Sequence, residues 1–358
     1  MQDLELIDLH CSDFLLLADR LHDLPALTRF SFLYTAQVTE QHASRFATAL
    51  ASCKSICDLF LSFDDVSVAA ATCIAQAVPA LSNCTRLGLR KEIAQGAFEE
   101  SWFYMPQIVH LDLQDVCDWR VGARQLHETL PNTVTSLHMS GGIVPPGTTL
   151  PDLTNLQELD IRCFMVATSF VQHFSSLVSL RTLSMPLRPL RVVCGLHMPA
   201  LLDDATVSLV ASLRSLSSLV QLDISGCWFP LDAVHSLVSL SQLQHLHMAK
   251  DHMFDQTALS LAEHVSALCE LRSFTFHECP LGPTMLLHSL ADDAFHRLKQ
   301  SLSTLPLLDE ACITIVPEGN PAEIAYNTQA AEFFTEVRGD GCGGAPAGQP
   351  SPAAASVC

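Results

Sequence analysis

The chain has 358 residues, and 49% of them are hydrophobic, so it has enough apolar material for a large core. Its 38 Asp and Glu residues outnumber its 19 Lys and Arg residues, which gives a formal net charge of -19. This charge argues against a nucleic acid partner, which needs a basic stripe, and against an anionic membrane surface. It favours solubility and a basic protein partner.

The N-terminal residues carry no secretory signal pattern, because residues 1–9 lack a basic stretch followed by an apolar one. The most apolar segment, residues 66–81, is too short and too polar to span a bilayer. The 14 cysteines contain no Cys-x-x-Cys pair, and most of them lie within apolar runs, as small buried side chains of a reducing compartment do. We therefore predict a cytoplasmic protein that does not associate with membranes.

A short apolar signature, Leu-x-x-Leu-x-Leu with other apolar residues substituting, recurs twelve times along the chain. Its copies begin at Leu4, Leu27, Ile56, Cys84, Ile108, Val134, Leu156, Leu180, Leu219, Leu243, Leu271 and Leu308. Most of the intervals between these copies lie in or near the ~20–29 residues that are typical of leucine-rich repeats. Two copies extend to Leu-x-x-Leu-x-Leu-x-x-Cys and end at Cys227 and Cys279.

On this signature the chain resembles the leucine-rich-repeat family over nearly its whole length. The longer units are similar to the ribonuclease-inhibitor-like and cysteine-containing subtypes. The resemblance implies an α/β solenoid, a horseshoe of about twelve irregular units with a parallel sheet on its concave side and helices on its convex side. Neighbouring units must stack, because no unit can bury its apolar face alone.

The first copy begins at Leu4, with no polar cap before it, so we expect a larger gene product or a first unit that frays or pairs. Amphipathic helices are predicted over Thr39–Ala51 and Asp204–Leu216, and Asp203 or Asp204 can cap the second one. Between them, residues 186–202 hold three prolines and form an irregular insertion. This insertion is either a tolerated surface loop or a loop that contacts a partner.

A further helix is predicted over Asp292–Leu302. Asn320, Pro321 and Glu323 form a helix start, which belongs to a C-terminal cap over residues 316–338. The repeat solenoid therefore spans residues 1–338. Residues 339–358 are rich in Gly, Ala and Pro and form a disordered tail.

Strand alternation predicts which side chains face the concave side. The signature residues point into the core, so the third, fifth and seventh positions face solvent. Adjacent strands lie ~4.8 Å apart, so equivalent positions of successive units form columns. The third column begins with Leu6 and Arg29, and the fifth begins with Asp8 and Ser31.

Two groups of charged and histidine side chains follow from these columns, and we predict that they bind a partner on the concave face. The first group contains His110, Asp112, His138, Glu158, Asp160 and Arg162, and the second contains Asp223, His245, His247 and His277. Histidine and carboxylate side chains can also bind a metal ion, which is one alternative. The other is a solvated face without a ligand, where the Asp–His pairs only raise the pKa values of the histidines. We predict no metal and no cofactor.

The chain contains neither a Gly-x-Ser-x-Gly nucleophile frame nor a Gly-x-x-x-x-Gly-Lys-Ser/Thr phosphate loop. We therefore predict a non-catalytic protein-protein interaction module rather than an enzyme. The resemblance leaves two alternatives, a GTPase-activating or other small-GTPase regulatory protein and a substrate-receptor subunit of a ubiquitin ligase. A metal-dependent hydrolase built on the histidine clusters is a third.

Overall fold

The structure is a computed structural model that describes residues 2–7, 11–35, 37–90, 107–114, 130–141, 143–144, 150, 152–162, 165–166, 168–186, 207–225, 228–229, 231–253, 255–278 and 292–314. The chain divides into two compact units, Met1–Glu318 and Gly319–Cys358. The predicted cap and tail, nearly all of the predicted insertion, and both signature cysteines, Cys227 and Cys279, lie outside the described residues. These assignments therefore stay predictions.

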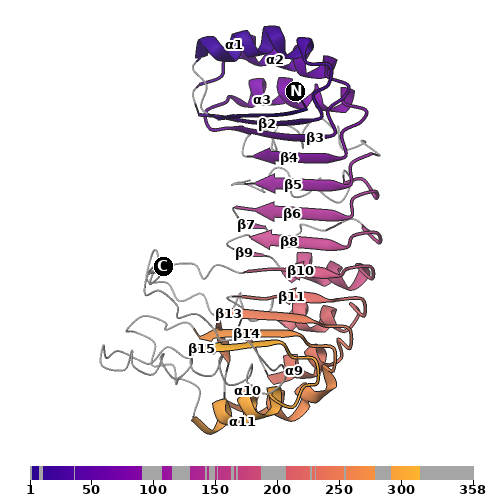
Figure 1. Ribbon diagram of the computed structural model, residues 1–358, viewed down its shortest axis with the longest axis vertical. Helices are drawn as coiled ribbons and strands as arrows, with labels where there is room; N and C mark the ends of the chain where they lie inside the picture. Colours follow the sequence, from indigo (N-terminus) through magenta and orange to yellow (C-terminus); the bar gives the residue numbers. More distant parts are fainter. Residues whose placement is uncertain are drawn as a thin grey trace, which may run out of the picture. The chain divides into compact units, whose positions relative to one another are not determined.

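Among the described residues, twelve strands follow one another in a single parallel sheet, in the order in which they occur along the chain (Figure 1). They are β1 (Asp3–Ile7), β2 (Arg29–Tyr34), β3 (Asp58–Phe63), β4 (Arg86–Arg90), β5 (His110–Gln114), β6 (Ser136–Ser140), β8 (Glu158–Arg162), β10 (Thr182–Ser184), β11 (Gln221–Asp223), β13 (His245–Met253), β14 (Ser273–Glu278) and β15 (Glu310–Thr314). Three short strands join in smaller pairings: β7 (Ile143–Val144) with β9 (Met165–Val166), and β12 (Trp228–Phe229) with β13. This order confirms the predicted α/β leucine-rich-repeat solenoid.

In the described part of the chain, helices and 3-10 turns lie in several of the intervals between strands. The helices are α1 (Cys11–Arg20), α2 (Glu40–Ser52), α3 (Val68–Ala75), α7 (Thr168–Gln172), α9 (Leu231–Val238), α10 (Asp255–His264) and α11 (Asp292–Leu302), and the 3-10 turns are η1 (Leu21–Asp23), η2 (Val78–Ala80), η3 (His173–Ser176) and η4 (Val265–Ala267). The α2 helix confirms the helix predicted over Thr39–Ala51, and α11 confirms the one predicted over Asp292–Leu302. Residues 207–213 are helical, within the predicted Asp204–Leu216, whose capping aspartates are not described.

Local sequence explains where α2 begins. Thr39 has an extended backbone, and its side-chain oxygen accepts a hydrogen bond from the backbone amide of His42. Such a cap satisfies one of the amides that have no partner in the first turn of a helix. The buried residues of α2 are Ala43, Phe46, Ala47 and Leu50, at helical spacing, so one face of the helix packs on the core.

The core lies between the sheet and the helices. Strands β5 and β6 alternate between half-buried and buried residues, and their buried members, such as Leu111 and Leu137, belong to the same cluster as the buried face of α2. Complete burial of one such side chain contributes about 1.5–3 kcal/mol. The opposite, polar side of the sheet faces solvent, and we call it the sheet face; it is the side that the sequence analysis predicts to be concave.

The predicted register is wrong in the first unit. A signature that begins at Leu4 predicts Leu6 and Asp8 beside Arg29 and Ser31, whereas the structure pairs Asp3 with Arg29 and Glu5 with Ser31. The sequence from Leu4 matches the signature in two overlapping ways. In the structure, Leu4 and Leu6 occupy its fourth and sixth positions, beside the buried Phe30 and Phe32. Packing on two aromatic residues decides the register.

Side chains at the corners before the strands link successive units. The Thr28 hydroxyl donates to the Gln2 carbonyl, the Ser55 hydroxyl to the Leu27 carbonyl, and the Asn83 amide to the Lys54 carbonyl. Further along, the Asn155 amide donates to the Asn132 carbonyl. Each bond satisfies a main-chain carbonyl of the preceding unit, so this ladder adds to the strand ladder and spaces the coils.

The cysteines only partly follow the prediction that they are buried. Cys53 and Cys84 are buried, whereas Cys57 and Cys269 are exposed, and all four are free thiols. Cys57 comes directly before β3 and directly after the buried Ile56, so neighbouring residues of one apolar run differ in burial. Within the described residues, no helix is long and apolar enough to cross a membrane.

Candidate functional site

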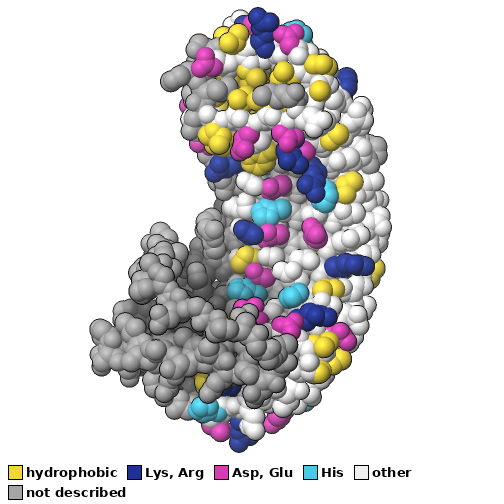
Figure 2. Space-filling model, in the orientation of Figure 1, with side chains coloured by type: hydrophobic (Ala, Val, Ile, Leu, Met, Phe, Trp, Pro, Cys, Tyr) yellow, Lys and Arg dark blue, Asp and Glu magenta, His cyan; other side chains and the backbone are white. Residues whose placement is uncertain are grey.

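The sheet face carries the predicted columns. The register places Asp112, His138 and Asp160 side by side on β5, β6 and β8. His110 and Glu158 lie in the next column, with Ser136 between them, and Arg162 lies beside Ser140. Figure 2 shows acidic, histidine and basic side chains gathered along the middle of this face. The structure thus brings together the first predicted group of six residues.

Asp112, Gln114, His138, Asp160 and Arg162 form a bonded group, which we call the His138 cluster. His138 Nδ1 lies 2.8 Å from Asp160 Oδ2, and Arg162 Nε lies 3.2 Å and 3.0 Å from the two oxygens of Asp160. On the other side, His138 Nε2 lies 3.9 Å from Asp112 Oδ1. Gln114 Nε2 donates to Asp112 Oδ2 at 2.6 Å. The imidazole therefore lies between two carboxylates, with its closer hydrogen bond to Asp160.

Asp112 Oδ1 is the exceptional atom of the His138 cluster. It is excluded from solvent, and no hydrogen-bond donor reaches it among the described residues. A buried carboxylate oxygen without a donor is costly, so this position attracts a proton or a cation. The Asp112 side chain as a whole keeps 35% of its surface exposed, so it is open to an incoming group.

The three titrating side chains of the cluster shift in different directions. The hydrogen bond to Asp160 raises the pKa of His138, although burial acts against this shift. Burial raises the pKa of Asp112, and His138 and Gln114 offset only part of it. Burial also acts to raise the pKa of Asp160, but hydrogen bonds from His138 and Arg162 together outweigh burial and lower it. Asp160 therefore stays ionised to a lower pH than a free aspartate, and His138 stays protonated to a higher pH than a free histidine.

The second predicted group is separate from the first. Asp223 lies beside His247, and His245 lies in the adjacent column with its Nδ1 at 2.8 Å from Ser273 Oγ. Asp223 Oδ1 accepts hydrogen bonds from the backbone amide of Ser225 at 3.0 Å and from its hydroxyl at 2.6 Å. These two hydrogen bonds order the turn after β11. His277, the remaining residue of the second group, has its backbone beside those of Ala249 and Thr314.

Strand β10 separates the two groups, because Ser184 lies between Asp160 and Asp223 in the fifth column. Two strand spacings, about 9.6 Å, divide these carboxylates. A single ion therefore does not join the two groups. In the part of the chain that the structure describes, no three His, Cys, Asp or Glu side chains are placed to hold a metal ion.

Phe60 is a further residue of this face and is not among the predicted binding residues. Phe60 occupies the fifth column on β3, beside Gly88 on β4, and it is only partly buried. A Cβ atom built on Gly88 would lie 2.4 Å from Phe60 Cδ2, so the ring lies directly over the glycine. Arg86 is exposed in the adjacent column. A partly exposed aromatic ring thus adds an apolar patch to a face that is otherwise polar. The available signal was a single Phe in a polar column, followed by Gly in the next unit.

We expect Gly88→Ala to displace the Phe60 ring, because the added methyl group occupies the space that the ring now fills. The variant should lose about 1 kcal/mol of unfolding free energy, the lower end for overpacking. In a Phe60→Ala background the same substitution should be neutral or stabilising, since alanine restricts the unfolded chain. Denaturant unfolding of the four proteins gives the coupling energy; equal costs of Gly88→Ala in both backgrounds would contradict the placement of the ring.

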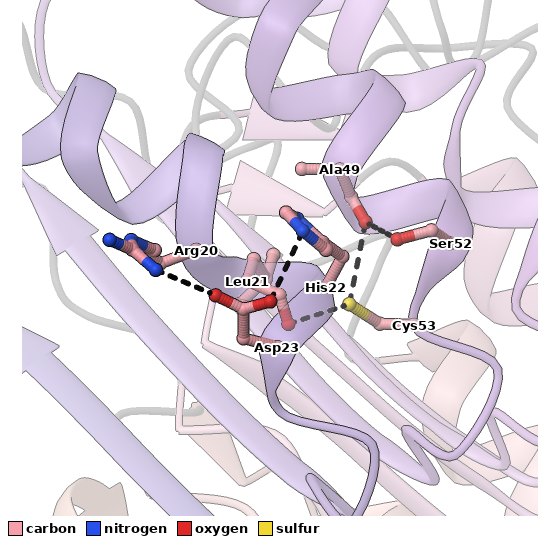
Figure 3. Close-up of polar contacts among 7 residues, drawn as sticks. All are labelled: Arg20, Leu21, His22, Asp23, Ala49, Ser52 and Cys53. Atoms are coloured by element: carbon pink, nitrogen blue, oxygen red, sulfur yellow. Dashed lines mark hydrogen bonds and ion pairs between the residues drawn. The ribbon is translucent and has the colours of Figure 1, made fainter.

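A further set of polar contacts, separate from the two predicted groups, lies where α1 and α2 end (Figure 3). Asp23 accepts from Arg20 at 3.2 Å and lies 3.2 Å from His22 Nε2, on the protein surface. The Cys53 thiol donates instead to the carbonyls of Ala49 and Leu21, at 3.3 Å and 3.6 Å. Burial raises the pKa of Cys53, so the thiol is neutral and is not an activated nucleophile.

A cavity of about 400 Å³ opens at this corner. Its lining residues are Leu21, His22, Leu24, Pro25, Ser52, Cys53, Lys54, Ser55 and Asn83. The polar groups of the lining are engaged in the corner ladder: Lys54 Nζ donates to the Ala80 carbonyl at 2.7 Å, and Asn83 donates to the Lys54 carbonyl at 2.8 Å. The cavity is therefore a by-product of the turn between units.

No family model matches the sequence, and no curated relative matches it. Among solved structures, the chain is similar to an internalin (InlF) from Listeria monocytogenes, with 13% identity and a TM-score of 0.41 over 82% of this chain and 76% of the internalin. It is similar to a TDR receptor, with 12% identity and a TM-score of 0.43 over 86% of this chain and 50% of the receptor. It is also similar to TLR13 in a complex with ssRNA13, with 15% identity and a TM-score of 0.46 over 82% of this chain and 36% of TLR13. The chain spans half or less of the last two proteins, and likenesses at this level carry no argument about its function.

Proposed function

We propose that this chain is a non-catalytic protein-protein interaction module, and that its partner binds the sheet face. The observation that carries the proposal is the set of polar columns on a solvent-facing sheet. Within it, the His138 cluster holds five side chains in fixed positions through four short polar contacts. Ordered charges on a rigid sheet lower the cost of orienting side chains on binding. The repeat supports a long contact surface, as in other solenoids.

The charge of the face supports a basic partner. From β5 to β13 the third, fifth and seventh columns hold the carboxylates of Asp112, Glu158, Asp160 and Asp223 against the single guanidinium of Arg162 among the described residues. Complementary charge steers a partner to this face and suppresses partners of like charge. The roles of small-GTPase regulator and ubiquitin-ligase receptor stay predictions, and so does the cytoplasmic location.

Reversing three of these carboxylates tests the proposal. A variant with Asp112→Lys, Asp160→Lys and Asp223→Lys should keep the solenoid, because all three residues lie on the solvent side of the sheet and the bonds that Asp223 loses are local ones, to Ser225. It should bind a protein partner about 100-fold more weakly or worse, since like charges across an interface cost several kcal/mol. The partner is first obtained by affinity capture from the native cell. Its dissociation constant is then measured with purified proteins.

The matched control reverses three exposed acidic residues away from the sheet face, Asp152, Asp232 and Glu263, to lysine. This variant has the same net charge as the test variant, so it separates a local contact from a general change in charge. Partner affinity that drops equally in both variants would contradict binding on the sheet face. Circular dichroism and thermal melting show whether each variant is folded.

A further inference from the structure

His138 lies between two carboxylates that a basic partner would also use. We propose that a proton on His138 and a cationic side chain of the partner compete for Asp112 and Asp160, so that the sheet face binds a Lys- or Arg-bearing segment when His138 is neutral and releases it when His138 is protonated. The inference rests on the proposed function, and it adds the chemistry of the partner and a means of regulating the contact.

The hydrogen bonds of His138 define where the proton goes. Nδ1 faces a carboxylate oxygen of Asp160 at 2.8 Å, so Nδ1 carries the hydrogen of the neutral ring. The second proton therefore binds Nε2, which lies 3.9 Å from Asp112 Oδ1. That oxygen is buried and has no hydrogen-bond donor within the described part of the chain. Protonation thus supplies positive charge at the one oxygen of the cluster that is unsatisfied.

The neighbours of His138 on both sides determine the balance of charge. On β5, Asp112 lies beside it and His110 lies in the next column. On β8, Asp160 lies beside it, flanked by Glu158 and by Arg162, which binds Asp160. With His138 neutral, these groups hold three carboxylates and one guanidinium, so the surface around His138 has a net negative charge. With His138 protonated, one more negative charge is compensated from within the protein.

A partner's cation and this proton act on the same carboxylates. The side chains of Asp112 and Asp160 are 35% and 23% exposed, so an incoming guanidinium or ammonium group approaches them from solvent. An imidazolium already between the carboxylates reduces their attraction for that group and repels it. Because binding and protonation are linked, a bound cation must also lower the pKa of His138.

The linkage between protonation of His138 and binding of the cation determines how steeply affinity depends on pH. The hydrogen bond to Asp160 raises the pKa of His138, so the ring binds its second proton more readily than a free histidine does. If proton and cation exclude each other at this site, affinity falls about tenfold for each pH unit below that pKa, and it is constant above it. Partial exclusion gives a smaller slope in the same direction.

The probe is a fluorescently labelled peptide, acetyl-hexa-arginine amide, with acetyl-hexa-glutamate amide as the control of opposite charge. Its dissociation constant for the full chain is measured by fluorescence anisotropy from pH 5 to pH 8 at constant ionic strength, since the contact is electrostatic. Three proteins are compared: the native chain, His138→Gln and His245→Gln. His245 lies on the same face but on β13, where its Nδ1 is bonded to Ser273 and no carboxylate flanks it in its column.

We expect the native chain and His245→Gln to lose affinity for hexa-arginine as the pH falls, with the same slope. His138→Gln should bind at pH 8 and show a clearly shallower slope. An NMR titration of the His138 ring should give a lower pKa in the presence of saturating hexa-arginine than in its absence.

A slope that is unchanged in His138→Gln, or a His138 pKa that hexa-arginine does not move, would overturn this inference and leave the proposed function standing. Absence of hexa-arginine binding to the native chain at pH 8, or equal binding of hexa-glutamate, would contradict the basic partner and the inference with it. Loss of the native fold is detected by circular dichroism, and His138→Asn then replaces His138→Gln.

Discussion

Phe274→Asp should unfold the C-terminal units of the solenoid. Phe274 lies on β14 between Leu246 and Ala311, and its side chain is completely buried. An aspartate there loses the apolar contacts and buries a carboxylate without a partner, so we expect a loss of more than about 4 kcal/mol of unfolding free energy. Hydrogen exchange measured by mass spectrometry should show the loss of protection in β13, β14 and β15 first, because units of a solenoid contact mainly their neighbours.

Thr275→Asp is the matched control for this prediction. Thr275 is the next residue on the same strand, and it points to the sheet face between His247 and Cys312. The same carboxylate should cost less than about 1 kcal/mol there, since surface substitutions are generally tolerated. Equal costs at both positions would mean that the alternation between core and sheet face is wrong on this strand.

Phe32→Ala should have the largest effect at the N-terminal end. The Phe32 ring is fully buried and lies 5.5 Å from the rings of Phe46 and Phe63 and 5.7 Å from that of Phe14, measured between centroids. Truncation leaves a cavity among aromatic rings that cannot collapse easily, so we expect a loss of about 3–5 kcal/mol. Hydrogen exchange should increase in β1, β2, β3, α1 and α2.

A second truncation tests whether this effect is local. Phe174, in η3, is also fully buried and contacts Phe170 at 5.8 Å between ring centroids. Phe174→Ala should cost a similar free energy but increase exchange around α7 and β10 instead. If both variants loosened the same segments, the protein would unfold as one cooperative unit, and the description by nearest neighbours would not hold.

The sequence predicts which side chains of the site are neighbours on adjacent strands. The signature places Asp112, His138 and Asp160 at the fifth position of three successive units, and parallel pairing in the same register makes them neighbours. The columns predict the two groups of polar side chains, but they do not predict that His138 bonds Asp160 closely while its other nitrogen stays 3.9 Å from Asp112. Rotamers decide this difference, and they depend on Gln114 and Arg162 in the seventh column.

The sequence by itself determined the solenoid, because a repeated apolar signature leaves each unit with a face that only another unit covers. It also determined the register of eleven of the twelve strands, since side chains alternate with a period of two and a shift by one residue would expose the leucines. Tertiary structure alone decided the first register, where Leu4 and Leu6 pack beside Phe30 and Phe32, and the place of Phe60 over Gly88. In the first unit two registers satisfy the local pattern, and packing on Phe30 and Phe32 selects one of them. The columns already place Phe60 beside Gly88, and the missing Cβ of the glycine leaves the room that the ring occupies.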